Sequence, residues 1–262
     1  MTDVYLDISK SGRVMAHVLE PPGLGIRFPS RDAMESGFTP VLADHLAWLS
    51  AHGEPVPPDA SYRIAEEVEV AGDFESGDDA GFYGPDTLPV TRNEIERYLR
   101  IGSWAHRELL ELVDPLPEEL LERRESPSVR SIREILLHVA QAELWYMTRI
   151  LDDPTDSGLP AVISQAHGWV KGHSARPLDC LRVSWEAFQE FARSLPPGWE
   201  GRVTVPGWYA SIPEKWSARK MLRRAIEHCR EHTRNIRRLL MSWEINGPRP
   251  PDDSPPGRRN QA

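Results

Sequence analysis

Two histidines, His228 and His232, stand four residues apart in the stretch AIEHCREHTRNI (225–236), which has the composition of a charged helix. Residues four apart lie one above the other on one face of an α-helix, so both imidazoles can point at the same spot. Neutral imidazole nitrogens are common ligands of zinc and related divalent metals. The spacing favours a metal site, although a chain with nine histidines can also produce such a pair by chance.

The helical pattern places both histidines at the border of an apolar face. Plotted at 100° per residue, the apolar arc contains Leu222, Ile226, Cys229, Thr233, Ile236 and Leu240. The opposite, polar face contains Arg223, Glu227, Arg230, Arg234, Arg237 and Arg238. A third histidine, His138, borders the apolar arc of another predicted helix.

A border position suits an open metal site, because a packed core holds the ligands while one coordination position faces a cleft. Two histidines of one helix and His138 of a neighbour would supply three nitrogen ligands, and water or a substrate would complete the shell. The alternative is that each border histidine simply bonds a nearby carbonyl group.

Other residues that could do chemistry have simpler interpretations. Cys229 points to the middle of the apolar arc, which predicts a buried core thiol. Glu231 either accepts a hydrogen bond from a ligand histidine or pairs with an arginine. Glu143 is predicted to point away from the site and is not assigned as a base. His167 and His173, in the stretch QAHGWVKGH, either approach the cleft or are solvated.

The chain has nine tryptophans, some of which could wall an apolar substrate pocket. The candidates are Trp145, Trp208 and Trp216, with predicted loops at 152–176 and 197–216 shaping the pocket. Ordinary packing in the core and loops is the alternative for most tryptophans.

Four helices of comparable length must position these side chains. Capping boxes at Thr91–Glu94 and Ser131–Glu134 predict helices over about 91–113 and 132–151. Pro177 and Ser217 suit the starts of two more helices, which end before Pro196 and near Trp243. Residues 90–246 are therefore predicted to form an antiparallel four-helix bundle.

The residues before the bundle have a different pattern. Alternating apolar and polar residues over 4–9, 13–20 and 62–70, with helical spacing over 38–53, predict a small β-β-(β)-α-β domain over residues 1–71. The first two strands are expected to form a hairpin with one buried face. Residues 72–89, rich in glycine and acid, are predicted to be a linker, and residues 247–262 a disordered tail. The fold class is thus a small α+β domain followed by an all-α domain.

Composition limits the function further. The net charge of −9 disfavours a mainly electrostatic nucleic-acid or membrane-surface role. Neither a membrane span nor a signal peptide is indicated. Two cysteines cannot form a disulfide framework, which fits a cytoplasmic protein.

The stretches SIREILLHVAQAELWY (131–146) and EKWSARKMLRRAIEHCREHTRNI (214–236) resemble the DinB-like, or YfiT-like, superfamily of four-helix bundles. The resemblance spans about residues 90–245. It implies that His138, His228 and His232 bind a divalent metal ion, most often zinc or nickel. The family often has an aromatic residue where this chain has Glu227, so the resemblance leaves the shape of the pocket open.

Residues 3–70, and in particular PPGLGIRFPSRDAMESGFTPVLADHLAWLSAHGEPVPPD (21–59), resemble a HicB-like domain of the kind found in certain antitoxins. The chain shows no DNA-binding helix-turn-helix or ribbon-helix-helix beside it. A substrate-gating or protein-interaction module is therefore expected here, and a nucleic-acid partner is not.

The DinB-like resemblance implies a metal-dependent transferase that activates a low-molecular-weight thiol such as mycothiol or bacillithiol, or a hydrolase that activates water. The partner would be a small-molecule substrate. Relatives are often dimers, so the resemblance also implies a homodimer. The alternative is a non-catalytic metal-binding bundle that acts as a stress-response or regulatory module through its HicB-like domain.

Overall fold

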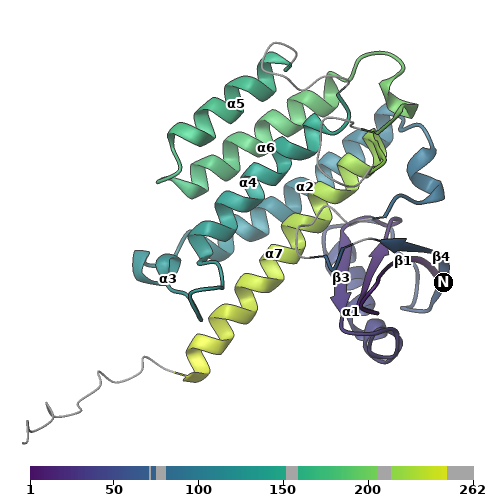
Figure 1. Cartoon of the computed structure of the whole chain (residues 1–262), viewed down its shortest axis with the longest axis horizontal. Helices are drawn as coiled ribbons and strands as arrows, with labels where there is room; N and C mark the ends of the chain where they lie inside the picture. The colour runs from purple at the N-terminus through teal and green to yellow at the C-terminus, as the bar shows by residue number, and fades with distance from the viewer. Residues whose placement is uncertain (71, 75–80, 152–158, 206–213, 247–262) are drawn as a thin grey trace, which may run out of the picture.

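The computed structural model describes residues 1–70, 72–74, 81–151, 159–205 and 214–246. A small sheet with one covering helix comes first, and a helical region follows (Figure 1). The elements of the first part are β1 (Thr2–Ser9), β2 (Val14–Val18), β3 (Leu24–Phe28), α1 (Arg31–Ala51) and β4 (Tyr62–Val70). This order agrees with the predicted β-β-β-α-β pattern, although α1 begins at Arg31, well before the stretch 38–53 that predicted it.

The four strands form one sheet in the order β3-β2-β1-β4. Neighbouring strands β1 and β2 are antiparallel, as are β2 and β3, whereas β4 runs parallel to β1. Helix α1 links β3 at one edge to β4 at the other, as a parallel pairing requires. It packs on the sheet through Met34, Phe38, Leu42 and Leu46, against side chains such as Val4 and Leu6.

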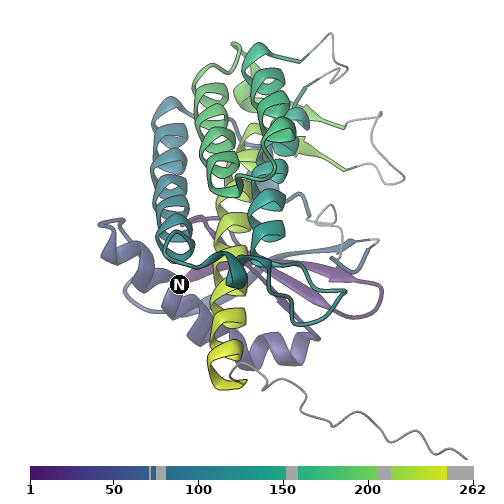
Figure 2. The same ribbon diagram turned by 90° about the vertical axis from the view of Figure 1, so that its left-hand side faces the viewer.

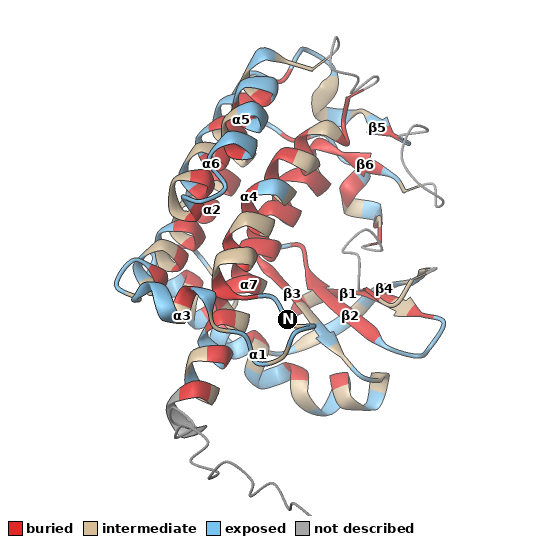
Figure 3. Cartoon of the chain, turned by 60° about the vertical axis from the view of Figure 1, so that its left-hand side comes forward, coloured by how far each residue is buried: buried red, intermediate tan, exposed pale blue. Residues whose placement is uncertain are grey.

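The opposite face of the sheet is also buried, which corrects the expectation of a hairpin with one solvated face. Asp7 and His17 are both 0% exposed, and every residue of β2 is buried. The cause is tertiary, because β3 packs against the last helix of the chain and a later segment covers β1 and β2. In Figure 3, most of β1 and β2 and the part of α7 beside the sheet are coloured as buried.

The covering segment contains the 3-10 helix η1 (Gly84–Thr87). It lies within residues 72–89, for which the sequence predicts a linker. The described part of this stretch includes three buried side chains, Phe74, Tyr83 and Asp86. The stretch therefore contributes contacts to the junction between the sheet and the helices.

The helical region contains α2 (Arg92–Val113), α3 (Glu118–Glu122), α4 (Ile132–Thr148), α5 (Ala161–Gly172), α6 (Pro177–Arg193) and α7 (Ala218–Asn246). A short hairpin of β5 (Val203–Thr204) and β6 (Trp216–Ser217), with the 3-10 helix η2 (Trp199–Gly201), precedes α7. Thr91 and Ser131 form the predicted capping boxes of α2 and α4. The Ser217 hydroxyl accepts a hydrogen bond from the Lys220 amide at the start of α7.

Helices α2, α4, α6 and α7 pack into a four-helix bundle, each against two of the others (Figures 1 and 2). The prediction that this bundle is antiparallel is wrong for two neighbouring pairs. Helices α2 and α7 run parallel, since Glu94 contacts Arg219 near their starts and Glu108 contacts Arg230 further along both.

Helices α4 and α6 are the second parallel pair. Arg133, at the start of α4, donates to the carbonyl of Ala175 just before α6, and Glu143 meets Ser184 near the middle of both helices. The physical reason is α5, which carries the chain back along the bundle before α6 begins. The sequence predicted a loop over 152–176, yet Ile163, Ala166 and Val170 form a buried stripe at helical spacing there.

One polar cluster lies inside the bundle, with a side chain from each of three helices. The Ser184 hydroxyl of α6 donates to Glu143 Oε2 of α4 at 2.7 Å, and His106 Nε2 of α2 lies 2.6 Å from Glu143 Oε1. Cys229 of α7 is buried, as its position in the apolar arc predicts. Among the described residues, no helix combines the length and apolarity that crossing a bilayer would need.

Candidate metal centre

Three histidines lie together on helices α4 and α7, which run in opposite directions. His138 lies two turns after the capped start of α4, and His228 and His232 lie in the middle of α7. The helices are antiparallel neighbours, since Tyr146 near the end of α4 packs against Trp216 just before α7. The packed core thus fixes the backbone behind each imidazole.

The three Nε2 atoms converge on one point. His228 Nε2 lies 3.1 Å from His138 Nε2 and 3.1 Å from His232 Nε2, and one ligand atom from each histidine lies within 4.8 Å of the others. Tetrahedral zinc with bonds of about 2.0–2.1 Å separates its nitrogen ligands by roughly 3.3 Å. The observed spacing is compatible with a shared cation. Within the described part of the chain, this is the one group of three or more potential ligands that meets such a distance criterion.

The surroundings keep the imidazoles neutral, which is the form that binds metals. Burial lowers the pKa of His138 to about 4 and that of His232 to about 3, and it lowers the pKa of His228 well below its usual range. His228 and His232 are 6% and 8% exposed, whereas His138 is half-buried. Two deeply buried imidazoles and one nearer the surface match the geometry expected of a metal site that is open on one side.

The Nδ1 atoms of His228 and His232 are buried and have no hydrogen-bond partner within the described residues. Glu231 was one of the candidates to orient a ligand histidine. Its carboxylate instead pairs with Arg27 of β3, with 3.3 Å between Oε1 and Nη2. Of the two alternatives for Glu231, the structure therefore favours the arginine pair.

Aromatic side chains extend from the histidines along α4. The ring of Tyr146 lies 5.8 Å from that of His228 and 5.6 Å from that of Trp216, and Trp145 packs edge-on against Trp216. Trp216 is 1% exposed and Trp145 is half-buried. Trp208, the third tryptophan proposed for a substrate pocket, lies outside the described residues.

The remaining candidates lie apart from the cluster. Glu143 contacts Ser184 and His106 inside the bundle, in agreement with the prediction that it points away from the site. His167 and His173 are exposed, on and just after α5, and the ring of His173 stacks on Trp169. They lie in or beside a helix and not in the loop that the sequence predicted.

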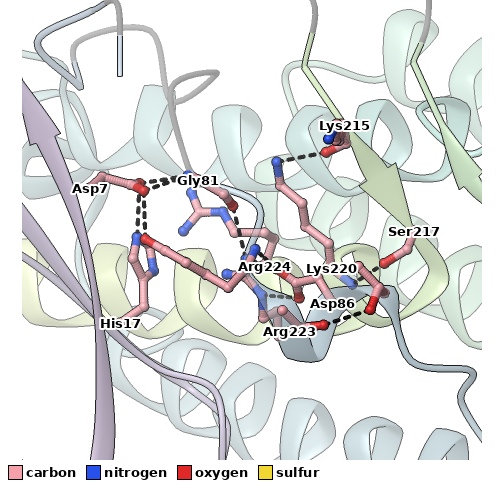
Figure 4. A network of polar contacts seen from close by, with 12 residues as sticks. Asp7, His17, Gly81, Asp86, Lys215, Ser217, Lys220, Arg223 and Arg224 are labelled. Carbon is pink, nitrogen blue, oxygen red and sulfur yellow. Dashed lines mark hydrogen bonds and ion pairs between the residues drawn. The ribbon is translucent and has the colours of Figure 1, made fainter. Parts of the chain in front are cut away.

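The sequence misses a buried network beside the histidines (Figure 4). Glu227, next to His228 in the chain, is 0% exposed and accepts hydrogen bonds from His17 Nδ1 of β2 at 3.1 Å and from Arg224 Nη1 at 2.8 Å. Arg223 contributes a longer contact of 3.3 Å to the same carboxylate. Glu227 thus connects the sheet to the helix that carries two of the three histidines.

Arg223 and His17 extend the network to the covering segment. The Arg223 guanidinium makes a two-point contact with Asp86, at 2.8 and 2.7 Å, with both side chains 0% exposed. His17 Nε2 lies 3.2 Å from Asp7 Oδ2. Burial opposes a charge on His17, but Glu227 and Asp7 outweigh it and raise the pKa of His17, so the imidazolium donates to both carboxylates.

This network buries part of the polar face of α7. Arg223, Glu227 and Arg230 are all buried, whereas Arg237 and Arg238, further along the helix, are exposed. Helical periodicity separates polar from apolar faces but does not reveal that a second polar surface covers one of them. The available signal was the dense alternation of arginine and glutamate over 223–231, combined with Asp7 and His17 on one face of a predicted hairpin.

Comparison with known proteins gives two matches. The model of the DinB superfamily matches residues 102–236, which is more than half of the chain and includes all three histidines. Among solved structures, the chain is similar to YfiT from Bacillus subtilis, described as "a probable metal-dependent hydrolase with an unusual four-helix bundle topology". That match has 12% identity and a TM-score of 0.43, and covers 59% of this chain and 90% of the other. No curated protein matches.

Proposed function

Because the chain belongs to the DinB superfamily, we propose that it is a metal-dependent enzyme in which His138, His228 and His232 hold a divalent cation, zinc or nickel. The observation that carries the proposal is the convergence of three neutral imidazoles at the border of a packed core, where His228 Nε2 lies 3.1 Å from the Nε2 atoms of His138 and His232. The resemblance of residues 3–70 to a HicB-like domain stays a prediction, because the family match begins at residue 102.

The proposed reaction is transfer of a low-molecular-weight thiol to a small electrophile, with hydrolysis by activated water as the related outcome. A divalent cation on three neutral ligands is a strong Lewis acid that lowers the pKa of a bound thiol or water, so the nucleophile forms near neutral pH. The histidines contribute no charge of their own, which preserves this acidity.

The chain's other residues would hold the reactants. Tyr146, Trp145 and Trp216 give an apolar side on which an electrophile can pack while water is excluded. The Tyr146 hydroxyl makes no hydrogen bond within the described residues, and burial raises its pKa to about 12. It therefore stays protonated and can donate a hydrogen bond to a bound reactant.

The first test measures the metal content of protein purified without added metal. We expect about one zinc or nickel ion per chain in the wild type, and a loss of at least tenfold in occupancy in His232→Ala at matched free metal, because two imidazoles alone hold a cation weakly. The matched control is His167→Ala, which removes an exposed histidine of α5. Equal metal content in His232→Ala and wild type would contradict the assignment.

The second test separates an enzyme from a metal-binding module. Zinc- and nickel-loaded protein is incubated with a panel of low-molecular-weight thiols and electrophiles, and thiol consumption is followed. We expect turnover that depends on metal and is lost in His228→Ala. Full metal occupancy with neither thiol consumption nor hydrolysis would instead support the non-catalytic alternative.

A further inference from the structure

A buried arginine shares the helix face that carries the two histidines of α7. Arg224 lies four residues before His228, so positions 224, 228 and 232 stack along one side of the helix. Its side chain is 1% exposed. Within the described residues Arg224 bonds only through Nη1, to Glu227, and its buried Nε has no acceptor.

An unmet donor on a buried guanidinium is unfavourable, because the group has lost its water without gaining a partner. Glu227 does not explain the whole side chain, since its carboxylate also accepts from His17 and Arg223 and engages only one nitrogen of Arg224. Glu227 therefore leaves the buried Nε of Arg224 without an acceptor among the described residues, on the helix that carries His228 and His232.

Two further arginines lie on elements next to the cluster, one on the strand that packs on α7 and one at the start of α4. Arg27 of β3 lies on the sheet face that packs on α7, and it reaches Glu231, the residue before His232. Arg130 directly precedes Ser131, the N-cap of α4. Arg130 is exposed and makes no hydrogen bond or ion pair within the part of the chain that the structure describes.

These positive charges lie close to the histidines in the fold. Arg224 is one helical turn before His228 on the same face of α7, and Arg27 contacts the residue next to His232. A cation on three neutral ligands would add more positive charge to this region, and a bound anion would offset it.

We propose that Arg224, Arg27 and Arg130 make the surroundings of the three histidines an anion-binding site, so that the substrate is a small molecule bearing a carboxylate or a phosphate. This inference rests on the proposed function and names its substrate class. Arg224 donates to the anionic group, because a guanidinium matches the geometry of both oxyanions. Arg27 and Arg130 attract the anion from solvent.

The experiment titrates the zinc-loaded full-length protein with benzoate, phenyl phosphate and neutral benzamide by calorimetry. We expect both anions to bind at least tenfold more tightly than benzamide, and the stronger of the two identifies the oxyanion. Arg224→Gln should weaken anion binding at least tenfold and Arg130→Gln at least threefold, with unchanged zinc stoichiometry. Arg238→Gln removes an exposed arginine from the same helix and should change nothing.

Arg130→Gln keeps the test decisive even when Arg224→Gln does not fold, because Arg130 is exposed and outside every core cluster of the described residues. Zinc binding with equal affinity for benzoate and benzamide, or anion affinities that are unchanged in both variants, overturns the anion site and leaves the metal assignment intact. Absence of zinc binding in the wild type instead overturns the proposed function itself.

Discussion

At the scale of single residues, protonation decides whether the three histidines can act as ligands. Burial is the main cause of their lowered pKa values, which reach about 4 for His138 and about 3 for His232. In an unfolded chain a histidine has a pKa near 6.5. Folding therefore holds these imidazoles in the metal-binding form well below neutral pH.

This difference predicts a pH dependence of the metal-free protein. Because the folded pKa of His138 is lower than the unfolded one, the unfolded chain takes up the proton first as the pH falls. We expect the free energy of unfolding to decrease by about 1–3 kcal/mol from this residue between pH 6.5 and about 4. Urea unfolding at pH 7, 5.5 and 4.5 measures this decrease in the free energy of unfolding.

His138→Gln is the control for the other groups that titrate in the same window. It should flatten the pH dependence without abolishing it, since His228 and His232 still contribute. An identical slope in wild type and His138→Gln would show that the His138 imidazole is not kept neutral by the fold.

The sequence indicates where the three histidines lie but not what surrounds them, for one physical reason. The border positions of His138, His228 and His232 follow from helical periodicity, a local property of the chain, and the DinB-like resemblance groups them. The roles of His17, Glu227 and Arg224 depend on which surface covers the polar face of α7, and that surface lies some two hundred residues away in the chain. Spacing within one helix carries no information about it.

At the scale of elements, close packing of α2 against α6 depends on a glycine. A methyl group added at Gly102 of α2 would overlap the Trp185 indole of α6, with Cζ2 at 2.8 Å. The indole has little room to move, because it stacks between His106 at 4.4 Å and Phe188 at 5.4 Å. The two helices can approach this closely only without a side chain at residue 102.

We expect Gly102→Ala to lower the free energy of unfolding by about 1–3 kcal/mol, since overpacking outweighs the gain in helix propensity. The matched control is Gly168→Ala on α5, where an added methyl meets nothing within 4 Å. That change should stabilise by about 0.5–1 kcal/mol. Urea unfolding of both variants measures these changes. A more stable Gly102→Ala would contradict the prediction that a methyl group at residue 102 overlaps the Trp185 indole.

Element boundaries were predictable where local chemistry marks them. The capping boxes at Thr91 and Ser131 gave the starts of α2 and α4, and Pro177 gave the start of α6. Helix directions were not predictable, because they depend on α5. That short helix has a weak apolar stripe and lies between two stretches with turn-like composition, so the chain reversal that it provides was missed.

At the scale of the whole molecule, buried charges join the sheet to the bundle. Asp86 and Arg223 form a fully buried pair across the junction, and His17 and Glu227 form another. Buried pairs of this kind add little net stability compared with apolar packing, but losing one partner leaves an uncompensated charge. The junction should therefore tolerate few changes.

We expect Asp86→Asn to lower the free energy of unfolding by about 3–5 kcal/mol, because Arg223 would keep its charge without its strongest partner. Glu35→Gln, which breaks the exposed Arg31–Glu35 pair within α1, should change it by no more than about 0.5 kcal/mol. Denaturant unfolding followed by circular dichroism measures both. Equal losses of unfolding free energy in Asp86→Asn and Glu35→Gln would contradict the prediction that the buried pair matters more than the exposed one.

The three clustered histidines come from two helices, and His138 and His228 are 90 residues apart in the chain. A cation shared by them would act as a reversible cross-link, closing a long loop that contains α5 and α6. Treatment with a chelator would then open that loop, and proteases would cut the chain between α4 and α7 faster without any change of sequence. The rate of proteolysis, measured with and without zinc, would thus show whether the chain's resistance to proteases depends on the supply of metal.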